Sequence, residues 1–198
     1  MRPKTALNQL GPLLKAPSFT SREADHLGVS ASILAHYTNH GDLERLGRGV
    51  YRAVGAPAFE DFRWEDLISA VQTVKDGVIC LTSALAIYGL TEEIPRQHWI
   101  AIRNSTRHRA ADSTKVVRMR NLEMGKTKIK MSGLTLSIFD RERTIVDAFR
   151  YLSHETAFKA LKIAVIKKGK EKVSLERMRK YAKVLRVRIE PYLLAVTT

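Results

Sequence analysis

Residues 19–30 read FTSREADHLGVS, and residues 41–52 read GDLERLGRGVYR. In the first stretch, Thr20 followed by Glu23 is the pattern of a capping box, in which two side chains satisfy free amides at the start of a helix. Gly28 permits the left-handed backbone of a tight turn. The first stretch therefore predicts a short helix that ends at a turn, with a second helix to follow.

The second helix is predicted to begin after Ser30, a favoured N-cap residue, and to end near Asn39. Ala24 would let the two helices cross closely, while Leu34 and Tyr37 would fill their shared core. This arrangement is a helix-turn-helix, whose second helix reads bases in the major groove of DNA. The candidate base-reading residues, which would face outward, are Ser30, Ala31, Ser32, Ala35, His36 and Asn39.

The second stretch predicts a β-hairpin, because two short apolar runs flank Gly47-Arg48-Gly49. Such a hairpin after a helix-turn-helix is a wing. Arg48 would extend from its tip toward DNA phosphates or the minor groove, with Arg45 and Arg52 on its strands. The alternative is an ordinary helical hairpin followed by a solvated turn.

Gly55-Ala56-Pro57 is predicted to be a linker between a DNA-binding domain at residues 1–56 and a second domain at residues 59–198. The second domain combines helical periodicity with alternating strands. The expected fold class is α+β, with an N-terminal winged helix-turn-helix followed by a larger mixed α+β domain. The predicted strands cover residues 98–103, 115–120, 127–131 and 134–139, and the predicted helices cover 64–74, 83–90, 140–151, 155–167 and a segment from 174.

The chain has a net charge of +14, and residues 103–198 hold 24 of its 34 Lys and Arg but 9 of its 20 Asp and Glu. Such an excess favours a polyanionic partner, although a solvated surface is the alternative for any one patch. We expect the second domain to contact the DNA backbone beside the winged helix. The candidate cations are Arg103, Arg107, Arg109, Arg118, Arg120, Lys126, Lys128 and Lys130.

Several classes of protein are disfavoured by what the sequence lacks. Cys80 is the only cysteine, no secretory signal is visible, and no apolar run approaches the length of a membrane span, so a cytoplasmic protein without membrane contact is expected. His36 and His40 stand four residues apart without a third ligand, and no glycine-rich phosphate loop is present. We therefore expect no metal, no cofactor and no enzymatic activity.

A nuclease was weighed because residues 112–147 contain several carboxylates, but metal-dependent phosphodiester cleavage needs clustered acids with a regular spacing. Glu123 and Lys126 are one residue too far apart for the usual Glu-x-Lys arrangement. The run Asp140-Arg141-Glu142-Arg143 is better explained as a capped helix start with local ion pairs. The carboxylates considered were Asp112, Glu123, Asp140, Glu142 and Asp147.

Residues 19–30 and 41–52 together resemble the N-terminal domain of AbiEi-family antitoxins. LTSALAIYGL at residues 81–90 and FDRERTIVD at residues 139–147 are similar to the C-terminal antitoxin domain of that family. The resemblance implies the antitoxin of a type IV toxin–antitoxin pair in phage defence. Such a protein represses its own operon at promoter repeats in double-stranded DNA, with dimerisation on the repeats, and opposes a nucleotidyltransferase-like toxin without necessarily binding it.

Two other functions remain open at this point. The second domain could mask a toxin directly, with exposed apolar groups near Trp99 and Tyr192 as the contact surface. The second alternative function is RNA binding by the basic surface. RNA-binding proteins usually stack bases on exposed aromatic side chains, but only 7% of the residues here are aromatic.

Overall fold

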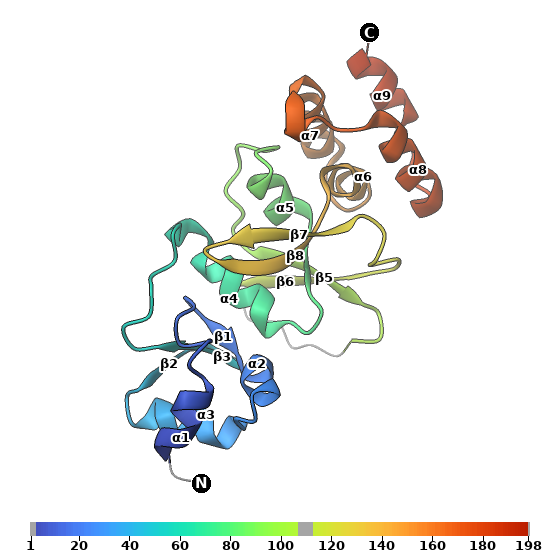
Figure 1. The fold of residues 1–198 in the computed structure, drawn as a ribbon. Helices are drawn as coiled ribbons and strands as arrows, with labels where there is room; N and C mark the ends of the chain where they lie inside the picture. Colours follow the sequence, from blue (N-terminus) through green and yellow to red (C-terminus); the bar gives the residue numbers. More distant parts are fainter. Residues whose placement is uncertain (1–2, 107–112, 198) are drawn as a thin grey trace. The chain divides into compact units, whose positions relative to one another are not determined.

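The N-terminal part of the chain is a winged helix-turn-helix (Figure 1), as seen in a computed structural model that describes residues 3–106 and 113–197. Three short strands form an antiparallel sheet in the order β1-β3-β2. This element order and the helices and strands that follow it confirm the expected α+β class. The elements here are α1 (Pro3–Gln9), β1 (Phe19–Thr20), α2 (Ser21–His26), α3 (Ala31–Asn39), β2 (Leu43–Gly47) and β3 (Val50–Ala53).

A small hydrophobic core holds these elements together. Ala24, Leu34 and Tyr37 are all buried in it, as their helical spacing predicts. Phe19 of β1 stacks on Tyr51 of β3, with ring centroids 6.1 Å apart. The helix-turn-helix and the sheet that includes the wing therefore pack on one shared core.

The N-terminal unit continues past the predicted linker. The 3₁₀ turn η1 (Phe62–Trp64) leads into α4 (Glu65–Thr73), which contacts all three strands of the small sheet. Ser18 Oγ donates a hydrogen bond to Gln72 Oε1 at 2.8 Å. The apolar face of α4 is buried. The first compact unit comprises residues 1–75 and 129–136 and so includes α4, which a domain ending at residue 56 would leave out.

The second compact unit comprises residues 76–128 and 137–198 and contains most of a five-stranded sheet in the order β6-β5-β4-β8-β7. Strands β5 and β6 run parallel, with Arg103 opposite Met119, while β4 is antiparallel to β5 and parallel to β8. The two-residue strand β4 was not expected, because its apolar run shows no alternation. The elements are β4 (Val78–Ile79), α5 (Leu81–Ile87), β5 (His98–Arg103), β6 (Thr114–Met119), β7 (Lys126–Met131) and β8 (Leu134–Phe139).

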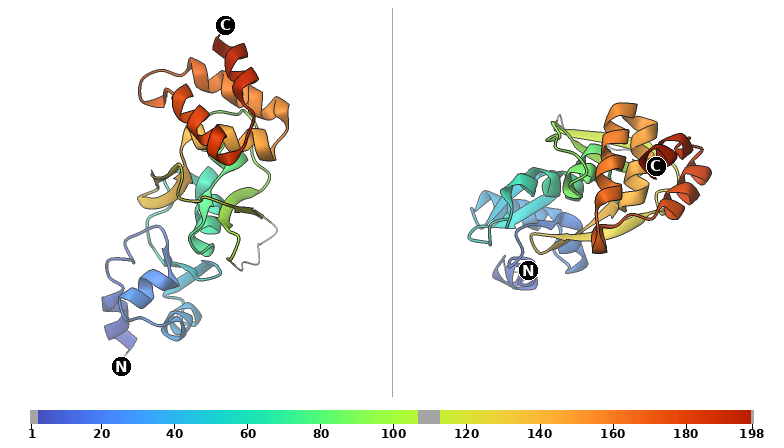
Figure 2. Two further views of the ribbon diagram at one scale, coloured as in Figure 1. Left: turned by 90° about the vertical axis from the view of Figure 1, so that its right-hand side faces the viewer. Right: turned by 90° about the horizontal axis from the view of Figure 1, so that it is seen from above.

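Helix α6 (Arg141–Tyr151) is the central helix of this unit, packed by α5, α7 and α8 (Figure 2). Residues 142–149 are all buried, so this helix is enclosed on every side. The predicted helical segment from residue 174 is two helices in the structure, α8 and α9. The remaining elements are α7 (His154–Ile166), η2 (Gly169–Glu171), α8 (Leu175–Leu185) and α9 (Glu190–Thr197).

Helix α6 contains a buried ion pair between Arg143 Nε and Asp147 Oδ2, which are 2.7 Å apart. The two side chains are 1% and 2% exposed. Arg143 Nη1 also donates to the carbonyl oxygens of Asn121 at 3.1 Å and Met124 at 3.0 Å. One guanidinium therefore joins α6 to the loop between β6 and β7.

The expectation of local ion pairs at residues 140–143 was wrong, although the helix cap was correct. Asp140 Oδ1 accepts from Arg143 N at 2.7 Å, as an N-cap should. Neither arginine pairs with a carboxylate in residues 140–143. Arg141 contacts Glu171 at 3.7 Å, and Arg143 pairs with Asp147, one helical turn later. Successive helical residues point in different directions, so these side chains reach different neighbours.

Burial raises the pKa of Asp147 from 3.8 to about 6, despite the opposing charge of Arg143. The Asp147 carboxyl therefore binds its proton more tightly in the folded chain than in the unfolded chain. As pH rises, Asp147 ionises first in the unfolded chain, which favours unfolding. We expect wild type to lose stability relative to Asp147→Asn between about pH 4 and pH 6. Urea unfolding of both proteins across this range measures the difference, and parallel stability curves would contradict it.

Gly125 is the last residue of the β6–β7 loop and has a φ of +71°, and a Cβ there would lie 2.6 Å from Arg143 Cβ. Gly125→Ala should therefore destabilise the chain by about 2–4 kcal/mol, from backbone strain plus overpacking. Gly169→Ala is the matched control, because Gly169 also has a positive φ (+60°) but no atom within 4 Å of its Cβ position. That control should cost about 1 kcal/mol in urea unfolding. Equal losses would show that the close approach to Arg143 is unimportant.

Candidate nucleic-acid interface

Helix α3 presents a continuous exposed face of short polar and small side chains. Its buried side carries Leu34 and Tyr37, so the helix is held by its apolar side alone. Small residues near its start would let the backbone approach base edges closely. The six predicted base-reading residues are all exposed: Ser30, Ala31, Ser32, Ala35, His36 and Asn39.

The N-termini of α2 and α3 are capped differently. Thr20 Oγ1 accepts from Glu23 N at 3.2 Å, and Glu23 Oε2 accepts from Thr20 N at 2.7 Å, so the predicted capping box is present. Ser30 occupies the N-cap position of α3, but its side chain makes no capping hydrogen bond. It pairs with Ser32 Oγ at 2.8 Å instead, an exposed contact that a DNA group could replace.

Two histidines lie at the end of α3. The rings of His36 and His40 are 4.0 Å apart, and His40 Nδ1 lies 2.8 Å from the carbonyl oxygen of His36. His40 follows the helix as its C-cap and is exposed. His40 is not among the predicted base-reading residues, but its i+4 spacing from His36 places it beside that predicted face.

The tip of the wing is formed by Arg48 and Gly49, between β2 and β3. Gly49 has a φ of +73°, and its carbonyl oxygen accepts from Ser21 N at 2.8 Å, which anchors the turn to the start of α2. Arg48 is exposed and makes no ion pair within the described part of the chain. Arg45 is also exposed, and its Nε donates to the carbonyl oxygen of Gly47 at 3.2 Å.

Arg52, the third predicted wing cation, is already engaged. It contacts Glu44 Oε2 at 2.7 Å and Glu65 Oε1 at 3.4 Å, and its side chain is 24% exposed. The first pair lies across β2 and β3, and the second connects the wing to α4. The structure therefore places Arg52 as a support for the wing, with Arg45 and Arg48 as the accessible cations.

The basic residues predicted to contact DNA from the second domain differ in their partners and in their exposure. Arg103 and Lys126 both pair with Glu123, at 2.7 and 3.3 Å, and Lys128 Nζ donates to Ser137 Oγ at 2.9 Å. Exposed Lys130 belongs to the hairpin tip of the first compact unit. Arg118 and Arg120 are exposed without an ion pair to any described residue, and Arg107 and Arg109 lie outside the described residues.

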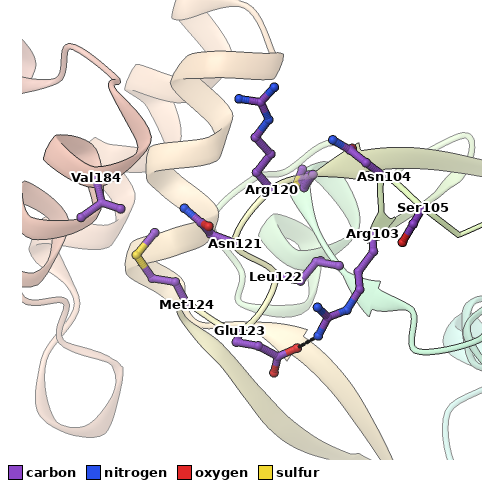
Figure 3. A pocket seen from close by; sticks show the side chains of 10 residues that line it. Arg103, Asn104, Ser105, Arg120, Asn121, Leu122, Glu123, Met124 and Val184 are labelled. Atoms are coloured by element: carbon purple, nitrogen blue, oxygen red, sulfur yellow. Dashed lines mark hydrogen bonds and ion pairs between the residues drawn. The ribbon is translucent and has the colours of Figure 1, made fainter.

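An open hollow of about 860 Å³ lies where β5 and β6 end (Figure 3). In this view Arg103, Asn104 and Ser105 lie on one side, and Met124 and Val184 lie on the other. Arg103 and Arg120 are among the predicted DNA-contacting cations, whereas the polar residues that follow each strand are not. Their alignment depends on the parallel pairing of two strands, which the sequence pattern does not reveal.

Trp99 and Tyr192, near which an exposed apolar surface is predicted, are both half-buried. Trp99 is covered by Lys115, whose Nζ lies 4.1 Å from the ring centroid. Tyr192 packs on Phe149 at 4.6 Å between centroids, and its hydroxyl lies 2.5 Å from His154 Nδ1. These contacts cover part of both rings, and the protein-binding surface near Trp99 and Tyr192 stays a prediction.

No helix in residues 3–106 and 113–197 is long and apolar enough to span a bilayer.

The two caps give a stability test for the helix-turn-helix. Thr20→Ala removes the hydroxyl that accepts from Glu23 N, while the backbone N–H of residue 20 can still donate to Glu23, and it should destabilise the N-terminal unit by about 1 kcal/mol. Ser30→Ala is the control, because Ser30 has the same capping position without a capping bond, and it should change stability by less than about half of that amount. Urea unfolding followed by circular dichroism measures both variants. A larger loss in Ser30→Ala would contradict the assigned hydrogen bonds.

Comparison with known proteins places these features in context. Residues 16–54, which contain α2, α3 and the wing, match the family described as transcriptional regulator, AbiEi antitoxin. The fold is similar to the crystal structure of the RV2827C protein from Mycobacterium tuberculosis, with a TM-score of 0.55 and 15% sequence identity over 90% of this chain and 71% of that chain. A comparison with curated protein sequences gives no match. The winged-helix segment at residues 16–54 is therefore similar to the AbiEi antitoxin family of transcriptional regulators.

Proposed function

We propose that the protein is a DNA-binding transcriptional repressor and antitoxin that regulates its own type IV toxin–antitoxin operon at promoter repeats. One observation carries this proposal. The segment that matches the AbiEi regulator family, residues 16–54, coincides with a winged helix whose α3 face and wing tip are both exposed. The regulator is proposed to act by occupying DNA, without catalysis.

Specificity would come from α3 in the major groove. Ala31 and Ser32 are small enough for the helix start to approach base edges, and Ser30 and Ser32 could donate or accept hydrogen bonds. Asn39 has an amide of the kind that forms paired hydrogen bonds with adenine, and His36 offers a further donor. Because Leu34 and Tyr37 anchor the opposite side of α3, these contacts would require no refolding of the helix.

Affinity for DNA would come from exposed arginines that can contact backbone phosphates. Arg48 extends from a turn whose backbone is hydrogen-bonded to Ser21, so the wing holds the charge in a defined place. Arg45 adds a second exposed charge on β2. Arg118 and Arg120 of the second unit would contribute backbone contacts that strengthen binding or bend the DNA.

The proposed functional partner is a nucleotidyltransferase-like toxin encoded beside the regulator. We propose opposition of the toxin without an obligatory complex, as the resemblance to the AbiEi family implies. Repeated half-sites in the promoter would place two copies side by side on DNA, since paired proteins commonly match paired sites. Co-purification of the chain with the toxin would show the direct contact that this proposal does not require.

A mobility-shift titration tests the proposed function. The purified chain is titrated against its own upstream DNA and a scrambled duplex of equal length at several salt concentrations. Tighter binding to the upstream DNA at every salt concentration is expected. Equal binding to both duplexes, governed by salt alone, would reject a sequence-specific repressor.

Arg48→Ala should weaken binding to both duplexes alike and lower the slope of log affinity against log salt by about one, because one phosphate contact is lost. Arg63→Ala is a matched control in the same unit, since Arg63 is exposed but already paired with Asp61 at 2.6 Å. The control should leave the slope within experimental error. The assignment of the wing fails if both variants behave alike.

Asn39→Ala should have a different effect from the loss of a wing cation. It is expected to relax preference at one base position, at a cost of about 1–3 kcal/mol for the preferred base. A panel of operator duplexes with single base changes measures this preference. Uniform weakening across the panel would instead place Asn39 on the DNA backbone.

A further inference from the structure

The segment between α5 and β5, residues 91–97, exposes an apolar side chain between charged neighbours. Ile94 is 91% exposed, the highest value among the large apolar side chains that the structure describes as exposed. Glu92 and Glu93 precede it, and both are exposed without an ion pair to any described residue. A single exposed apolar side chain is ordinary, so Ile94 is informative only if the molecule carries a matching surface.

The conformation of this segment is restricted by its own residues. Glu93 N donates to Thr91 Oγ1 at 3.1 Å, which bends the chain just before Ile94. Pro95 follows, and a proline disfavours helical backbone at the residue before it. A segment that is restricted before contact loses less entropy when it is bound.

A matching surface lies at the turn between α8 and α9. A pocket of about 430 Å³ is present there, which we call the α8–α9 pocket. Two of its lining residues, Ala182 and Ile189, belong to the hydrophobic core of the second unit, so the pocket has a fixed apolar floor. An aliphatic side chain that enters this pocket exchanges water for an apolar surface. The apolar lining consists of Ala182, Val187, Ile189 and Pro191.

The charged side chains that line the α8–α9 pocket include two cations with no carboxylate partner in the part of the chain that the structure describes. Arg179 and Glu190 pair with each other at 3.0 Å. Lys183 and Arg188 are exposed and make no ion pair with any described residue. The pocket thus combines an apolar floor with two available positive charges. This combination is complementary to an apolar side chain that lies beside two carboxylates.

Within one chain, residues 91–97 and the α8–α9 pocket lie on different sides of the second unit. The pKa of Lys159 on α7 is raised by its hydrogen bond to Glu155 and also by the charges of Glu93 and Glu92, which places the segment beside α7. In Figure 1, α7 lies between this segment and helices α8 and α9. Contact between the segment and the pocket therefore requires two copies of the chain.

We propose that two copies of this chain associate through the second unit, with Ile94 of one copy in the α8–α9 pocket of the other. The glutamates beside Ile94 pair with Lys183 and Arg188 across the contact. This contact needs no DNA, so it stands whether or not α3 reads an operator. One segment and one pocket bury less than the roughly 1,200 Å² of a standard interface, and the association is therefore weak.

Sedimentation equilibrium of the full chain without DNA, from micromolar to millimolar concentrations, tests the apolar part of the contact. Wild type should self-associate, and Ile94→Ser should weaken this association at least about tenfold, because burial of the aliphatic side chain is lost. Ile166→Ser is the matched control, since Ile166 is 74% exposed but is followed by two lysines, and it should stay within about twofold of wild type. A wild type that is monomeric throughout would overturn the proposal, as would equal losses in both variants.

Charge reversal tests the polar part of the contact. One variant carries Glu92→Lys and Glu93→Lys, and the other carries Lys183→Glu and Arg188→Glu. All four positions are exposed, and circular dichroism confirms that both variants are folded. The measurements use about 0.15 M salt, which screens the repulsion due to net charge.

Each charge-reversed variant alone should associate at least about tenfold more weakly than wild type, because like charges then meet at the contact. An equal mixture of the two should regain association to within about threefold of wild type, because the new lysines of one variant meet the new glutamates of the other. A mixture that associates as weakly as either variant alone would assign self-association to another surface and would overturn the proposal.

Discussion

Arg143 lies inside the second unit with its guanidinium surrounded by acceptors from two distant segments of chain. It pairs with Asp147 on its own helix and donates to the carbonyl oxygens of Asn121 and Met124. Its guanidinium also lies 4.6 Å from the ring centroid of Phe139 at the end of β8. A buried charge is tolerated only when it is paired and its donors are satisfied, so this residue fixes the β6–β7 loop against α6. Removing one partner of such a pair typically costs about 3–5 kcal/mol.

This constraint connects the interior of the second unit to its surface. The loop that Arg143 holds is the same loop that presents Arg120 and Asn121 at the hollow. Gly125 completes the attachment, since a side chain at that position would collide with Arg143. The hollow is therefore shaped by a buried interaction, although every cation that faces it is on the surface.

The two units use their charges in a similar way. In the winged helix, Arg52 is paired with Glu44 and Glu65 and supports the wing, while Arg48 at the tip makes no ion pair with any residue that the structure describes. In the second unit, Arg103 is paired with Glu123, while Arg120 stays free. A paired cation has a fixed position but a reduced field, whereas a free cation keeps its full attraction for phosphate. The number of cations available to a polyanion is therefore smaller than the count of Lys and Arg behind the net charge of +14 indicates.

Local signals in the sequence were enough to predict the winged helix, because each of its features depends on neighbouring residues. The capping box of Thr20 and Glu23, the turn at Gly28 and the glycine-flanked Arg48 act within a few positions of the chain. Other features depend on residues that meet only in the folded chain. Distant segments meet where α4 packs on the small sheet, at the partners of Arg52 and Arg143, and at the hollow that Asn104 and Asn121 both line. The sequence by itself determined the winged helix and the excess of positive charge, and tertiary structure decided which charges are paired, because pairing depends on distances that no local pattern contains.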